Sequence, residues 1–114
     1  MALNDAALTL GANSIRTGIT HMSLHTTGAV TLSTGESTAA RQPVSGTVNA
    51  SADISWTNVA FTGGAASGPV VRVGYWSALT AGTYLGGSLL TGDAAFNAAG
   101  AYTVTSVTET STAT

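Results

Sequence analysis

The stretch VVRVGYWSALTAGTYLGGSLLTGD, residues 70–93, decides which fold the sequence predicts. Its first part, residues 70–78, alternates as a strand does, because successive side chains of a strand point to opposite faces. Val71, Val73 and Tyr75 share one face, and Val70, Arg72 and Trp76 share the other. The Gly86–Gly87 pair interrupts a second apolar run, which indicates a bulge or a close approach of two backbones. The stretch therefore predicts two short strands joined by a glycine-rich turn.

Short strands of the same kind are predicted along the rest of the chain. In the alternating segment 18–27, Met22 and Leu24 share one face, and His21, Ser23 and His25 share the other. Further strands are predicted over residues 28–35, 54–63 and 100–111. In the 54–63 strand, Val59 and Phe61 lie on one face, with Trp56 nearby. Short strands at regular spacing, separated by glycine-rich turns, predict a mainly β fold, a small antiparallel β-sandwich or barrel-like domain.

Two segments depart from the strand pattern. Leu3, Ala7 and Leu10 recur near helical spacing, and Asn4 is placed to cap a helix. We therefore predict a short N-terminal helix over about residues 4–15, with a strand as the alternative. A polar segment of small residues, about 33–53, is too long for a tight turn. We expect it to form a long functional loop, a disordered segment, or an extended arm that lies on a neighbouring chain.

The composition describes one small domain with few charges. The 114 residues suffice for a single core, so residues 1–114 are predicted to form one domain. The chain has no cysteine and no lysine, and 7% of its residues are charged, against roughly 25% in an ordinary soluble domain. A surface with so little charge gives weak protection against association, which is typical of a subunit in a larger assembly.

The same composition argues against several classes of partner. Three scattered arginines cannot neutralise a phosphate backbone, so we expect no nucleic-acid partner. No apolar run approaches the roughly 18–20 residues that span a bilayer, so we expect no membrane partner. The N-terminus has no basic segment before its apolar residues, and we therefore expect synthesis in a cytoplasm without export through a signal peptide.

Residues with catalytic or metal-binding chemistry are few and scattered. His21 and His25 would lie about 13 Å apart on a strand, too far apart to share one metal ion within a chain. A metal site built from the same histidine of several chains is the remaining alternative. No serine lies in a G-x-S-x-G elbow, and no two carboxylates are paired in the sequence. We therefore expect no enzymatic activity, no metal and no cofactor.

The aromatic residues are the remaining candidates for binding. A platform for sugars, an interface with another protein, and plain core packing are the three interpretations of these rings. They are Trp56, Tyr75, Trp76, Tyr84 and Tyr102. Because Tyr75 and Trp76 are adjacent on one strand, they point to opposite faces, and one of them is expected outside the core. Our candidate interface residues are Trp76, Arg72, Trp56, His21 and His25.

Three segments in order resemble a family of small virion proteins of tailed bacteriophages. They are ITHMSLHT at 19–26, ARQPV at 40–44, and the long segment from VVRVGYWSA to AYTVT at 70–105. The resemblance implies a structural role in the virion, no catalysis, and symmetric assembly of many copies. Members of the family are labelled as tail-fibre proteins or as capsid decoration and head-fibre proteins. Arg72 and Met22 depart from the family pattern, which has a small polar residue or histidine and a valine there.

Together these observations predict a structural protein that is made in the host bacterial cytoplasm and located in a phage virion. We expect a capsid decoration or cement protein whose partners are the major capsid protein and sister copies of itself, with a trimer as the expected unit. The alternatives are a tail, tail-tip or fibre component, and a virion-displayed module that binds host glycans. We expect no small-molecule ligand.

Overall fold

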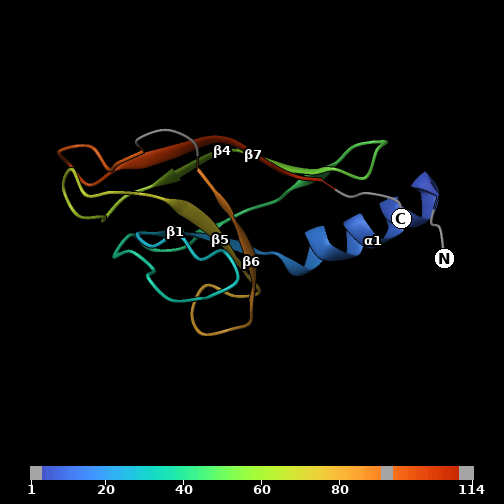
Figure 1. Cartoon of the computed structure of the whole chain (residues 1–114), viewed down its shortest axis with the longest axis horizontal. Helices are drawn as coiled ribbons and strands as arrows, with labels where there is room; N and C mark the ends of the chain where they lie inside the picture. Colours follow the sequence, from blue (N-terminus) through green and yellow to red (C-terminus); the bar gives the residue numbers. More distant parts are fainter. Residues whose placement is uncertain (1–3, 91–93, 111–114) are drawn as a thin grey trace.

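The chain folds into two antiparallel β-sheets with one N-terminal helix, as Figure 1 shows. The computed structural model describes residues 4–90 and 94–110. One sheet has four strands in the order β2-β1-β5-β6, and the other has three in the order β3-β4-β7. The elements are α1 (Asp5–Gly18), β1 (His21–His25), β2 (Gln42–Pro43), β3 (Thr47–Val48), β4 (Ile54–Phe61), β5 (Arg72–Trp76), β6 (Tyr84–Leu89) and β7 (Tyr102–Glu109). The predicted mainly β fold of antiparallel strands with a short N-terminal helix is confirmed.

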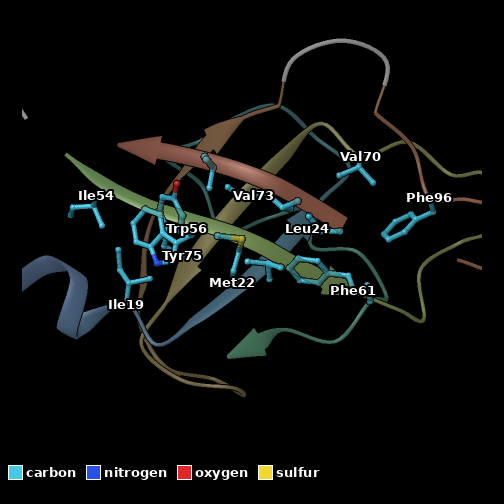
Figure 2. Packing of buried hydrophobic residues seen from close by; sticks show 14 of the residues in the cluster. Ile19, Met22, Leu24, Ile54, Trp56, Phe61, Val70, Val73, Tyr75 and Phe96 are labelled. Atoms are coloured by element: carbon cyan, nitrogen blue, oxygen red, sulfur yellow. The ribbon is translucent and has the colours of Figure 1, made fainter. Parts of the chain in front are cut away.

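The hydrophobic core lies between the two sheets, as Figure 2 shows. The four-stranded sheet contributes Met22 and Leu24 from β1 and Val73 from β5, all fully buried. Across the core, the ring of Trp56 on β4 stacks on the ring of Tyr75 on β5, with centroids 4.8 Å apart. An offset aromatic stack of this kind contributes about 0.5–1.5 kcal/mol beyond the area it buries, which ties the two sheets together.

The side-chain alternation of β4 and β7 changes in the middle of both strands. Trp56 and Val59 of β4 are both buried although they are three residues apart, and they pair with Val107 and Val104 of β7. Asn58 lies at the change and has a φ of 53°, in the left-handed region that asparagine tolerates better than most residues. Because of this change, the Trp56 side chain joins the core in the same way as that of Val59.

The helix α1 starts where the sequence predicts and ends at Gly18, three residues later than predicted. The side chain of Asn4 accepts a hydrogen bond from the Ala7 N–H at 2.9 Å, as an N-cap residue does. Ala12 and Ile19 are buried, whereas Leu10 on the opposite side of the helix is 75% exposed. Figure 1 shows α1 extending from one end of the sandwich, which gives the molecule its longest dimension of 47 Å.

The structure corrects one predicted strand and divides the polar segment. Residues 28–35, predicted as a strand, form an irregular loop that is closed by a hydrogen bond from the Thr26 N–H to the Gly35 carbonyl, at 2.8 Å. The polar segment 33–53 is mostly irregular, but it contains β2 and β3, which pair with β1 and β4 of the same chain. The ends of two predicted strands, residues 91–93 and 111, lie outside the described residues.

Candidate functional site

A layer of polar side chains covers the face of β1 and β5 that points away from the core. Ser23 and His25 project from β1, and Arg72 projects from β5, where it lies directly opposite His25. All three side chains are fully buried. Strands in the middle of a sheet are buried on both faces only when something covers the second face, and here the cover is the loop of residues 26–35.

Arg72 holds this loop through its guanidinium group. Its Nε donates to the Thr27 carbonyl at 2.6 Å, and its Nη2 donates to the carbonyls of Leu32 and Thr34 at 2.8 and 2.7 Å. Its Nη1 donates to the hydroxyl of Tyr84 at 2.6 Å. Within the described residues, no carboxylate lies within salt-bridge distance of Arg72. The buried charge is therefore stabilised by carbonyl dipoles, which explains why this segment forms a loop and not a strand.

Tyr84 extends the same arrangement from β6. Its hydroxyl accepts the hydrogen bond from Arg72 and donates one to the Val30 carbonyl at 2.8 Å. Four carbonyl groups of the loop thus receive hydrogen bonds that originate from one arginine and one tyrosine. A polar backbone group removed from water without a partner is costly, and these two side chains supply donors to the four carbonyls of Thr27, Val30, Leu32 and Thr34.

His25 is the second polar anchor, and its hydrogen bonds determine its tautomer. Nδ1 lies 3.0 Å from the Thr34 carbonyl, which can only accept, so Nδ1 carries the proton. Nε2 of the neutral ring then accepts from the Ser23 hydroxyl at 2.6 Å, and Ser23 Oγ accepts from the Trp76 indole N–H at 2.8 Å. Burial lowers the pKa of His25, an effect that the bond to Thr34 opposes and the charge of Arg72 reinforces.

Gly74 leaves the space in which this network forms. It lies opposite Ser23 on β1, and a Cβ at this position would come within 2.5 Å of His25 Nε2 and 2.6 Å of Ser23 Oγ. A larger residue would push both polar groups apart. Glycine at this strand position therefore reflects the close approach of side chains from the neighbouring strand.

The hydrogen bond between Ser23 and His25 is the one feature that this pair shares with the nucleophile and base of a hydrolase. In a hydrolase the base is oriented by a carboxylate and the hydroxyl faces a substrate site. Here the third partner is the Thr34 backbone carbonyl, and both side chains are fully buried. As the chain is folded, no substrate can reach the Ser23 hydroxyl, and the pair serves as part of the internal network.

Arg41 covers the remaining side of the layer. Its guanidinium carbon lies 3.4 Å from the centroid of the Trp76 ring, in a cation–π contact. It also forms a two-pronged salt bridge with Glu36, at 2.9 and 3.0 Å, and donates to the carbonyls of Ala78 and Ala81. The side chain therefore joins the segment before β2 to the turn between β5 and β6, and it leaves Trp76 only 7% exposed.

The structure places four of the five candidate interface residues inside the chain. Trp76 and Arg72 lie in the polar layer with His25, and Trp56 lies in the core at 2% exposure. Their side chains are not available as a contact surface, because Arg41, the 26–35 loop and the opposite sheet cover them. His21 is half-buried, and its Nδ1 lies 2.9 Å from the Thr20 hydroxyl. Tyr75 and Trp76 point to opposite faces of β5, as predicted: Tyr75 packs in the core, and Trp76 lies outside the core cluster in the polar layer. Because both faces of β5 are covered, neither ring offers an exposed contact surface.

The aromatic rings do not form a platform on the surface either. Trp56, Tyr75 and Trp76 are buried, and Tyr84 points into the polar layer. The Tyr75 hydroxyl donates to the Glu109 carboxylate at 2.7 Å, at the edge of a hollow of about 240 Å³ between α1, β6 and the end of β7. Burial and this carboxylate raise the pKa of Tyr75 above its usual value, so the hydroxyl stays protonated.

Sequence reasoning missed the two residues that complete the layer, Arg41 and the hydroxyl of Tyr84. One signal for such a layer was present: Arg72 stands in an otherwise uncharged strand, and a buried cation requires several acceptors. Residues 4–90 and 94–110 contain no group of three histidines, cysteines or carboxylates that could hold a metal ion. In the same residues, no helix is long and apolar enough to cross a membrane.

Comparison of the chain with protein-family models, with curated proteins and with solved structures gave no match.

Proposed function

We propose that the chain is a structural protein of a tailed-phage virion that decorates the outer face of the capsid in many copies. The observation that carries this proposal is that the potentially reactive side chains of the chain form hydrogen bonds with one another and with its own backbone. Ser23, His25 and Arg72 are fully buried and hydrogen-bonded within the chain, so the described surface offers none of them for chemistry. Such an arrangement supports a role in assembly in preference to catalysis.

The character of the surface supports the same proposal. The chain carries five acidic and three basic residues, so copies can approach one another with little electrostatic repulsion. Several large apolar side chains are exposed on the helix, the loops and β6, and exposed apolar groups favour contact with other proteins. They are Leu10, Ile15, Leu32, Leu79, Leu85 and Leu89.

The partners under this proposal are the major capsid protein and sister copies. The motif set at residues 19–26, 40–44 and 70–105 provides the link to phage virions, and the trimer stays a prediction that depends on this resemblance. A tail or tail-tip location is the competing place in the particle. A glycan-binding role is less well supported, because three of the five aromatic residues that would form the platform are buried.

The proposal is tested on particles of the phage that carries this chain. Heads and tails are separated by sedimentation, and the chain is quantified in each fraction by mass spectrometry. We expect it in the head fraction at a constant ratio to the major capsid protein. Particles that lack it should lose their DNA at a lower temperature, and purified chain added back should restore heat resistance. Recovery only in the tail fraction, or in neither fraction, would overturn the proposal.

A further inference from the structure

The two sheets have four edge strands, and three of them are protected against pairing with another chain. β2 and β3 are two residues long, and β2 ends in Pro43. β6 is distorted by a register shift opposite Tyr75 and Trp76, and its Gly86 has a φ of 139°. Short length, proline and bulges are the usual features that keep sheet edges from pairing.

β7 is the one edge strand among the described residues that lacks these features. It has eight residues without glycine or proline, and its single charged residue, Glu109, is at its end. It pairs with β4 in one register, from Tyr102 opposite Phe61 to Glu109 opposite Ile54. Figure 1 shows β7 lying along β4 at the border of the molecule. Within the described part of the chain, no strand pairs with its other edge.

The order of buried, half-buried and exposed residues along β7 is the same from either end of the strand. Its two ends, Tyr102 and Glu109, are half-buried, and two valines further inward, Val104 and Val107, are buried. The residues between and beside the valines are exposed hydroxyl residues: Thr103, Thr105, Ser106 and Thr108. The strand is therefore symmetric in burial about a point between Thr105 and Ser106.

This symmetry depends on the change of alternation in the middle of the strand. In an uninterrupted strand, residues an odd number apart point to opposite faces, so Val104 and Val107 would lie on different sides. Because both point into the core here, the two halves of β7 are equivalent under a two-fold axis. An antiparallel partner with the same sequence can then match buried with buried positions and exposed with exposed positions along the whole strand.

We propose that β7 is a self-association edge, which pairs antiparallel with β7 of a second copy and joins two three-stranded sheets into one of six strands. Tyr102 of each copy lies opposite Glu109 of the other. The inference supplies a contact between sister copies, and it rests on the proposed function only for its place in the virion. The contact is two-fold and produces a dimer, so a trimer would use other surfaces.

The side chains favour this register over the alternatives. Val104 lies opposite Val107 of the second copy on the core side, and Thr103 lies opposite Thr108 on the outer side. Cross-strand pairs of β-branched residues and of threonines stabilise antiparallel sheets. The two Glu109 carboxylates lie at opposite ends of the pair, whereas a parallel pair would place them side by side. A shift by one residue in either direction would set the valines against exposed threonines or Ser106.

Disulfide trapping tests the register in the purified full-length chain. Because the chain has no cysteine, the single variants Thr103→Cys and Thr108→Cys each introduce one thiol at a known position. In the proposed pair, the thiol introduced by Thr103→Cys in one copy lies opposite the thiol introduced by Thr108→Cys in the other. Their Cβ atoms are about 4.5–5.5 Å apart, within reach of a disulfide once the strands adjust slightly. Two copies of the same position are about 17 Å apart. A mixture of the variants in a glutathione buffer should form a covalent dimer, and either variant alone should not.

A charge-swap pair provides the matched measurement of affinity. Thr103→Lys with Thr108→Lys places lysine opposite lysine at two positions, and Thr103→Lys with Thr108→Glu places lysine opposite glutamate. Both positions are exposed and face the uncharged Ala60 and Ser55 on β4, so both variants should fold alike. We expect the dimer of the first variant to be at least tenfold weaker by analytical ultracentrifugation, and the second to recover to within about threefold of the original chain.

The outcomes separate this inference from the proposed function. A chain that stays monomeric at about 1 mM, a covalent dimer formed by Thr103→Cys alone, or equal affinity of the two charge variants would each overturn the β7 contact. None of these results bears on the location of the chain in a particle, which the head and tail fractions measure. Conversely, a β7 dimer found for a chain absent from virions would support the contact and contradict the proposed function.

Discussion

His25 and Arg72 lie directly opposite each other on β1 and β5, and both side chains are fully buried on the same face of the sheet. One is neutral and the other is a cation whose described partners are carbonyl and hydroxyl groups. They share the Thr34 carbonyl, which accepts from His25 Nδ1 and from Arg72 Nη2. The conformation of the 26–35 loop therefore depends on the charge states of these two residues.

The first prediction concerns the Arg72 side chain. Replacing it in Arg72→Met leaves the part-buried Thr27 and Leu32 carbonyls without their side-chain donor, and it leaves the Thr34 carbonyl with His25 Nδ1 as its side-chain donor. We expect a loss of about 3–5 kcal/mol in the free energy of unfolding, measured by urea denaturation. Arg72→Lys should lose about 2 kcal/mol, because an ammonium group cannot reproduce the planar set of donors.

The matched control for this prediction is Arg16→Met, on the partly exposed surface of α1. It removes the same charge and should change the free energy of unfolding by less than about 0.5 kcal/mol. Equal effects of the Arg16 and Arg72 variants would contradict the role assigned to the buried guanidinium.

The second prediction is a loss of stability in mild acid. The pKa of His25 is lowered in the folded chain, with Arg72, Glu36 and Arg41 as the neighbouring charges, so the unfolded chain takes up a proton at higher pH than the folded chain does. The stability that neutral His25 contributes is complete above about pH 6.5 and is lost as the pH falls below it, by at most about 1.4 kcal/mol per pH unit. Unfolding measured between pH 7.5 and 5 checks this.

A pair of glutamine variants separates His25 from the other titrating groups. His25→Gln should make the stability curve flatter over this pH range, whereas His21→Gln leaves the buried network intact and should keep the original slope. If the two variants follow the same curve, the buried histidine is not the acid-sensitive group.

The third prediction concerns the space at Gly74. In Gly74→Ala the new methyl group meets His25 Nε2 and Ser23 Oγ, so we expect a loss of about 1–3 kcal/mol and a shifted indole N–H signal of Trp76 in NMR spectra. Gly28→Ala is the control, because a Cβ at that position has no neighbour within 4 Å. An unchanged Trp76 signal in Gly74→Ala would argue against a tightly packed network.

The fourth prediction concerns the change of alternation at Asn58. Because its φ is 53°, Asn58→Gly should maintain or slightly raise stability, and Asn58→Val should lower it by about 1–2 kcal/mol. Thr57→Val, at the neighbouring exposed position, should have little effect. Thermal unfolding of the three variants provides the comparison, and a stable Asn58→Val chain would contradict the strained conformation.

The periodic parts of the fold were predictable from the sequence. Alternation assigned the two faces of β1 correctly, since Met22 and Leu24 lie in the core and Ser23 and His25 lie on the other face. The Gly86–Gly87 pair predicted a bulge, and the register between β5 and β6 does shift there. Asn4 predicted the start of the helix. These features depend on residues close together in the chain, which a local pattern records.

The polar layer was not predictable in the same way. Arg72 bonds to carbonyls 38 to 45 residues away, and a backbone carbonyl has no side-chain signature in the sequence. Residues 28–35, which form most of the irregular loop, were therefore predicted as a strand. The cover on Trp76, which was a candidate interface residue, was not predictable either, since the packing of Arg41 on its ring joins segments 35 residues apart.

The central claim, that this chain decorates a phage capsid, is tested most directly by a cryo-electron microscopy reconstruction of the intact virion. The account predicts density on the outer face of the capsid shell into which the two-sheet sandwich fits, in contact with the major capsid protein and repeated over the shell. A shell without such density, or a fit found only in the tail, would contradict it.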